Sequence, residues 1–140
     1  MDSIVASADN AFEVYVNGSL VASSSNWKVA ASYVGDLAAG DVIAVHATDA
    51  GGMAGFLAQV EWDDATVVSD GSWLVSTVSQ PGWELPGFDD SGWAGASTYG
   101  SYGVAPWYMN VAGFPAGSTA QWIWSDDANG DNQVWLRITL

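Results

Sequence analysis

The sequence predicts an all-β fold, an antiparallel jelly-roll β-sandwich in a single domain spanning residues 1–140. Short stretches of alternating apolar and polar residues recur along the chain, separated by turns rich in Gly, Asp and Asn. No amphipathic helical pattern of ten or more residues accompanies them. Because 49% of the 140 residues are hydrophobic, the chain can also build a core of useful size.

The N-terminal part carries the clearest strand patterns. Residues 4–8 predict a short first strand, and residues 11–16 alternate with a period of two, which is typical of a half-buried strand. Asn17 and Gly18 follow, and this pair accepts positive φ at both central positions of a tight turn. A β-hairpin is therefore the strongest local prediction, with a return arm that begins at Leu20.

Further strands are predicted along the rest of the chain. Residues 42–48 are apolar on both faces and should lie at the centre of a sheet. In residues 55–62, one face carries Phe56, Ala58, Val60 and Trp62, and the other carries Leu57, Gln59 and Glu61. The remaining predicted strands are residues 29–34, 72–78, 119–124 and 133–140.

Residues 79–118 show no convincing strand or helix and are nonetheless rich in aromatic residues. Loops longer than about 12–15 residues are uncommon in compact domains and are usually functional or disordered. Disordered segments are poor in aromatics, so we interpret this one as an ordered loop layer over the sandwich. Its rings are Trp83, Phe88, Trp93, Tyr99, Tyr102, Trp107, Tyr108 and Phe114.

The charge balance restricts the partners. The chain has sixteen acidic and two basic residues, which gives a formal net charge of −14. Such a charge repels phosphate backbones and anionic bilayers. We therefore expect no nucleic-acid partner unless a divalent cation intervenes. No run of 18 apolar residues is present, so no membrane insertion is expected. Cysteine is absent, which excludes disulfides and thiolate zinc sites.

Several motifs resemble the galactose-binding-domain-like β-sandwich modules that accompany bacterial α-L-rhamnosidases and β-galactosidase-type hydrolases. The resemblance implies a jelly-roll sandwich, often a structural calcium ion, and frequently sugar binding by loops at one end. Ligand residues vary between members, so no ligand position is carried over. The motifs are ADNAFEVYVNG (8–18), Trp27, GDVIAVHATD (40–49), AGFLA (54–58), SDGSW (69–73), GW (82–83), FDDSGW (88–93), YG (102–103), PW (106–107), AQWIWS (120–125) and VWLR (134–137).

Aromatic loop residues are the candidate sugar contacts, because a pyranose ring stacks on an aromatic plane while nearby carboxylates accept its hydroxyls. Trp83, Trp93 and Trp107 lie inside the motifs, and for them capping of the sandwich is the favoured alternative. The tyrosines lie among Gly and Ser, where exposure is easier. The predicted ligand-binding set is Tyr99, Tyr102, Tyr108, Trp107, Trp83, Asp89 and Asp90, although for the two aspartates the favoured alternative is that they satisfy backbone N–H groups of their own turn.

Oxygen-bearing residues near the C-terminus predict an irregular calcium site at Asp126, Asp127, Asn129 and Asp131. An EF-hand is excluded, because counting from Asp127 places Asn132 and Ile138 where that loop needs Gly and Glu. Further oxygen sources in turns are Asp9, Asp36, Asp41 and Asp49.

No catalytic constellation is evident, and we expect no enzyme activity. His46 is the single histidine and lies in an apolar strand, and no Gly-x-Ser-x-Gly elbow occurs. A carboxylate pair using Glu61 or Glu84 would need a cleft that a small sandwich seldom forms.

We therefore predict a non-catalytic carbohydrate-binding module of an exported protein, extracellular or at the cell surface, with a polysaccharide or glycan as its partner and possible Ca²⁺ stabilisation. The alternative is a structural or adhesive module that packs on neighbouring domains or on copies of itself. Strand-like sequence reaches both ends, so we expect one module of a longer chain.

Overall fold

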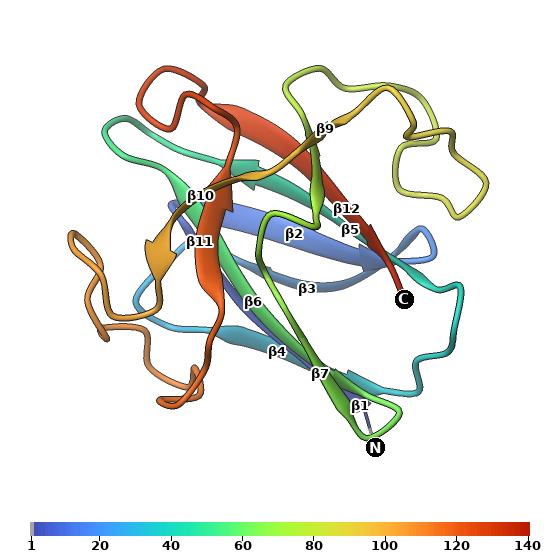
Figure 1. Cartoon of the computed structure of the whole chain (residues 1–140), viewed down its shortest axis with the longest axis horizontal. Helices are drawn as coiled ribbons and strands as arrows, with labels where there is room; N and C mark the ends of the chain where they lie inside the picture. Colours follow the sequence, from blue (N-terminus) through green and yellow to red (C-terminus); the bar gives the residue numbers. More distant parts are fainter. Residues whose placement is uncertain (1) are drawn as a thin grey trace.

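Two antiparallel β-sheets pack face to face in the computed structural model, which describes residues 2–140 and contains no helix in that range (Figure 1). The predicted all-β sandwich is confirmed. The part of the chain described accordingly holds no helix that could cross a membrane. The strands are β1 (Asp2–Asp9), β2 (Ala11–Val16), β3 (Ser19–Ser24), β4 (Ala31–Gly35), β5 (Val42–Thr48), β6 (Gly55–Trp62), β7 (Ala65–Val68), β8 (Leu74–Ser76), β9 (Ala94–Gly95), β10 (Ser97–Ser101), β11 (Gln121–Trp124) and β12 (Gln133–Thr139).

Sheet A has the strand order β10-β11-β6-β1-β4, with β7 also paired to β6, and sheet B has the order β3-β2-β5-β12-β8-β9. The predicted hairpin is β2–β3, and its turn residues Asn17 and Gly18 have φ of 49° and 88°. β5 lies between β2 and β12, as its apolar faces predict.

Three short strands were not predicted. β7 follows a turn in which Asp63 and Asp64 both have positive φ, and it is only four residues long. β9 and β10 lie inside residues 79–118, so the expectation of a strandless layer there is wrong. Because these strands have two and five residues, their pairing with β8 and β11, and not their own sequence pattern, defines them.

The aromatic segment therefore has two halves on different sheets. β9 is the edge strand of sheet B and β10 is the edge strand of sheet A, so the chain changes sheets between them. Residues 79–93 precede this crossing and pack beside sheet B, whereas residues 102–118 follow it and cover sheet A. In Figure 1 the two loops lie at opposite sides of the molecule, yellow at the right and orange at the left.

A second apolar core forms where residues 102–118 cover the outer face of sheet A. Trp107 stacks on Trp122 of β11, with ring centroids 4.3 Å apart and an interplanar angle of 19°. Leu57, expected on the polar side of its strand, is fully buried beneath this cover. The cluster consists of Leu57, Trp107, Val111, Phe114, Ala120 and Trp122.

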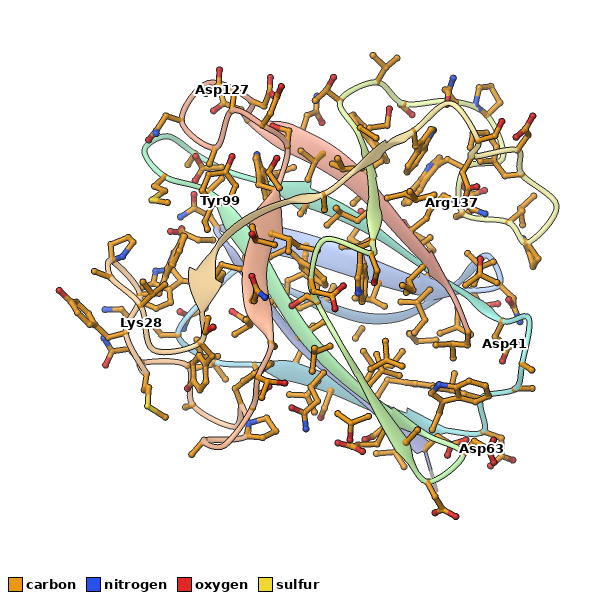
Figure 2. All side chains as sticks on the ribbon, viewed as in Figure 1. Lys28, Asp41, Asp63, Tyr99, Asp127 and Arg137 are labelled. Atoms are coloured by element: carbon orange, nitrogen blue, oxygen red, sulfur yellow. The ribbon has the colours of Figure 1, made fainter. Side chains whose placement is uncertain are left out.

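Arg137 of β12 holds residues 79–93 on sheet B. Its side chain is only 2% exposed, and its Nε donates to Asp90 Oδ2 at 2.9 Å. Its Nη1 donates to the carbonyl oxygens of Trp83 and of Leu85, the latter at 3.0 Å. The guanidinium also lies 5.2 Å from the ring centroid of Phe88, and Figure 2 shows Arg137 directed from β12 toward this loop. One buried cation thus fixes several points of an otherwise irregular segment.

Gly55 is the position in β6 on which the stacked tryptophans rest. A Cβ there would lie 2.8 Å from Trp122 Cε3 and 3.0 Å from Trp107 Cζ2. We expect Gly55→Ala to lower the free energy of unfolding by about 1–3 kcal/mol, the usual cost of overpacking. Urea denaturation measures it. Gly117→Ala is the control, because a Cβ there meets nothing within 4 Å, and equal stability of the two variants would contradict the packing role.

Arg137→Met should release residues 79–93. The change leaves the Asp90 carboxylate and two carbonyl oxygens without their donor, and we expect a loss of about 2–3 kcal/mol, less than for a wholly buried pair because Asp90 is 28% exposed. Hydrogen exchange followed by mass spectrometry should show faster exchange in 79–93 than in 102–118. Lys28→Met removes the other basic charge from an exposed site and serves as the control. Equal acceleration of both loops would argue against Arg137 as a local anchor.

Candidate functional site

The predicted sugar contacts do not form one surface. Trp107 is 1% exposed and its ring is stacked on Trp122. Its expected role as a ligand contact is therefore wrong, and the alternative, that it caps the sandwich, is correct. Tyr102 is half-buried, packs edge-on against Phe114 at 4.9 Å, and donates its hydroxyl to the carbonyl oxygen of Val111 at 3.2 Å. Tyr99 donates its hydroxyl to the carbonyl oxygen of Ser125. These rings support the loops that carry them.

The other predicted contacts are dispersed. Trp83 is half-buried and meets Tyr15 edge-on at 5.6 Å. Asp90 is held by Arg137, whereas Asp89 is exposed. Tyr108, with φ of 52°, is 56% exposed and is the one predicted tyrosine whose ring projects freely.

The predicted calcium loop is closed by its own hydrogen bonds. Asp127 Oδ1 accepts from the Gly130 N–H at 2.8 Å, and Asp131 Oδ2 accepts from Ser125 Oγ at 2.6 Å. Figure 2 shows Asp127 on this loop at the end of the molecule where Tyr99 also lies. Asp126 and Asn129 are exposed. Over residues 2–140, no three His, Asp or Glu side chains are grouped to hold a metal ion, and calcium at this loop stays a prediction.

His46, the single histidine, has a packing role. Its ring stacks on Trp135 at 4.8 Å with an interplanar angle of 10°, and its Nε2 is 3.1 Å from Gln133 Oε1. The carboxylate of Glu61 accepts hydrogen bonds from Gln59 and Thr66 on the surface.

A different set of oxygens has the electrostatics of a binding site. Asp49, directly after β5, is 7% exposed, and its Oδ1 is buried without a hydrogen-bond partner among the described residues. Its Oδ2 accepts from the Gly51 N–H at 3.2 Å. A buried carboxylate oxygen without a donor is unfavourable, and burial raises the pKa of Asp49. Such an oxygen is suited to a small bound cation.

Asp9, at the end of β1, is the neighbouring acid. Burial raises the pKa of Asp9, against the opposing effect of the Trp107 Nε1–H, which donates to its Oδ2 at 3.0 Å. The negative charge of Asp9 contributes in turn to the raised pKa of Asp49, after burial. The two carboxylates therefore repel each other in a partly dry environment.

The backbone explains why these residues meet. The chain passes from sheet A to sheet B between Asp9 and Asn10, and Asn10 N–H donates to the carbonyl oxygen of Thr48 at 2.8 Å. Asn10 Oδ1 accepts from the Ala50 N–H at 2.6 Å and so ties the loop after β5 to the β1–β2 junction. In that loop Gly51 and Gly52 have φ of 136° and 80°, which allows the tight path past Asp49.

Counter-cations from the protein are missing at this junction. The ion pairs among residues 2–140 are Arg137 with Asp90 and His46 with Glu13, so neither Asp9 nor Asp49 has a basic partner within 4.0 Å. Carboxylate and amide oxygens are the ligands of hard cations such as Ca²⁺. The orphaned Asp49 oxygen, together with the carboxylate of Asp9 and the amide oxygen of Asn10, supplies oxygens of the kind that a calcium ion takes. Clustered, perturbed carboxyl groups are also a general mark of functional sites.

Sequence reasoning named Asp9 and Asp49 only as further oxygen sources and did not bring them together. Forty residues separate them, and the indole that donates to Asp9 belongs to Trp107, 98 residues after Asp9. The motif containing Asp9 and Asn10 was the available signal, but its partner could be found only after folding.

The fold and this junction define a β-sandwich module with an acidic, partly buried site. No family model matches the chain. It is 33% identical over 121 residues to an α-L-rhamnosidase of Streptomyces avermitilis, across 75% of this chain and 12% of the enzyme. It also matches the structure of Pleurotus ostreatus lectin, in the apo form and in complex with GalNAc, with a TM-score of 0.71 and 34% identity over 79% of this chain.

The chain is thus a β-sandwich module related to a region of α-L-rhamnosidase and to Pleurotus ostreatus lectin. It spans 12% of the rhamnosidase and 34–35% of the lectin chain. The expected relation to rhamnosidase-associated modules is confirmed, while the wider galactose-binding-domain-like assignment stays a prediction.

Asp49→Asn should stabilise the calcium-free protein at neutral pH. A raised folded-state pKa means that the folded state binds more protons than the unfolded state above about pH 4, so this contribution to stability is lost as pH rises. Removing the charge removes that loss. In EDTA at pH 7 we expect a higher Tm, by about 3 °C for each kcal/mol regained, and a smaller difference at pH 4.

Asp64→Asn is the matched control, because it removes one charge from an exposed position. Calorimetric scans at both pH values make the comparison. An Asp49→Asn variant that gains no more than Asp64→Asn at pH 7 would contradict the desolvation argument.

Proposed function

We propose that this chain is a non-catalytic carbohydrate-binding module of an exported, extracellular or cell-surface protein. The observation that carries the proposal is its 34% identity, over 79% of its length, to a lectin whose structure contains GalNAc. A relation at that identity includes side chains as well as backbone course. GalNAc is therefore the first sugar to test.

The junction of Asp9, Asn10 and Asp49 is the proposed binding site. Sugar hydroxyls need acceptors in fixed positions, and these three side chains supply carboxylate and amide oxygens. Trp27 lies on the same side of β1, because Ser7 and Asp9 share the outer face of that strand and Ser7 Oγ donates to the Trp27 carbonyl oxygen at 2.6 Å, and its ring packs against the second core. Trp27 is half-buried, so part of its ring remains available.

A calcium ion is part of this proposal. Held by Asp49, Asp9 and Asn10, it would neutralise two carboxylates that repel each other, and it would supply direct coordination to sugar hydroxyls. The protein residues hold and orient the ion, and Trp107 Nε1–H fixes the carboxylate of Asp9.

The relation to α-L-rhamnosidase carries no enzymatic proposal. The matched region is 12% of that enzyme, and a module of this kind can be joined to a catalytic domain without sharing its chemistry. The geometry of His46, stacked on Trp135, supports packing instead of proton transfer.

The second candidate is an adhesive or self-assembling module. Val104, Tyr108 and Met109 are exposed on the loop over sheet A, at 37%, 56% and 53%, and such side chains suit contact with a neighbouring domain or another copy. This surface requires neither sugar nor calcium.

Isothermal titration with GalNAc, followed by a glycan array, tests the first candidate in calcium and in EDTA. We expect GalNAc to bind only in calcium, and Ca²⁺ at about 100 times its Kd to add roughly 2.7 kcal/mol, or about 8 °C in Tm. Asp49→Asn should abolish both effects and Asp64→Asn should retain them. No glycan binding in either buffer, together with concentration-dependent sedimentation, would favour the adhesive candidate instead.

A further inference from the structure

We propose a second sugar-binding site, in a groove of about 530 Å³ beside β8 and β9. Three separate segments form it: residues 75–80 at the end of β8, residues 89–97 around β9, and Ser125 and Asp126 after β11. Its volume lies within the range of about 300–1,000 Å³ for small-ligand sites. The groove shares no residue with the Asp9–Asp49 junction. The proposal rests on the carbohydrate-binding function above and extends it.

Trp93 is the aromatic wall of this groove, and its orientation is set before any ligand arrives. Its Nε1–H donates to Gln80 Oε1 at 3.0 Å, and its ring packs edge-on against Phe88 at 5.7 Å. Phe88 lies in turn beneath the guanidinium of Arg137. Because the indole is already fixed, binding does not have to immobilise it.

Acceptors line the rest of the groove. Asp89 Oδ1 accepts from the Ser91 N–H at 3.0 Å, and hydrogen bonds from the Ser91 side chain and backbone lower the pKa of Asp89. Asp126, which is exposed, also lines the groove, as do the hydroxyl-bearing residues Thr77 and Ser97. An aromatic plane flanked by carboxylates and hydroxyls is the lining that a pyranose requires.

Charge selects among pyranoses. Two carboxylates in the groove and a net charge of −14 on the chain disfavour uronic acids and sulfated sugars. The occupant we assign is one neutral pyranose unit of a polysaccharide.

Fluorine NMR of protein labelled with 5-fluorotryptophan tests the groove directly. The chain has nine tryptophans, and the Trp93 signal is assigned by its loss in Trp93→Phe. The probes are GalNAc and the neutral tetrasaccharides cellotetraose, mannotetraose and xylotetraose, with trigalacturonic acid as the acidic comparison. We expect a neutral tetrasaccharide to shift the Trp93 signal in the wild type and in Asp49→Asn, and trigalacturonic acid to leave it unchanged.

Substitutions in the groove test how much its side chains contribute to the affinity for the tetrasaccharide. Trp93→Ala and Asp126→Asn should each weaken binding of that tetrasaccharide to the Asp49→Asn protein by about tenfold or more, as expected for central contacts. Trp83→Phe, in the same loop but outside the groove, should change it less than about twofold. Asp126→Asn removes no packing contact, so it decides the matter if Trp93→Ala loosens the loop.

The outcomes separate the two proposals. If sugars shift other tryptophan signals and leave that of Trp93 unchanged, the second site is overturned while the carbohydrate-binding function stands. If no sugar shifts any signal, both are overturned. A response of Trp93 to trigalacturonic acid equal to its response to neutral sugars would overturn the assigned ligand class.

Discussion

The stack of Trp107 on Trp122 above Gly55 is the contact on which the half of the molecule with the Asp9–Asp49 junction depends. It buries the outer face of β6 and gives residues 102–118 an apolar anchor, so that a long irregular loop can be ordered without helices or disulfides. The same indole donates to Asp9, so packing and polar organisation are coupled through one side chain. A substitution that disturbs this stack would therefore change the position of the Asp9 carboxylate as well as the stability of the fold.

Arg137 performs the corresponding task on sheet B by polar means. Where the first anchor is a pair of rings, this one is a buried guanidinium that satisfies a carboxylate and two carbonyl oxygens. By fixing Phe88 it also positions Trp93, so the groove is a consequence of how the loop is held. Each half of the aromatic segment is thus held on its sheet by a different kind of anchor, and the crossing between β9 and β10 separates the two halves.

Electrostatics explain why the Asp9–Asp49 junction suits a cation. In a chain with sixteen acids and two bases, the single arginine is committed to Asp90, which leaves the two junction carboxylates uncompensated. Their burial is unfavourable for folding, an arrangement that is common where a ligand or metal restores the balance. Exposed acids can rely on solvent, but Asp49 cannot, because one of its oxygens is sealed from water.

The sequence by itself determined the longer strands of the sandwich, the β2–β3 hairpin and the central place of β5, because period-two alternation and the Asn17–Gly18 turn act over a few residues. It also identified residues 79–118 as ordered. Only the tertiary structure decided which rings of that segment are buried, since their burial depends on the sheet that each half meets after β9 and β10 cross. The pairing of Asp9 with Asp49 was decided at the same level, because desolvation and repulsion arise only when distant segments enclose them.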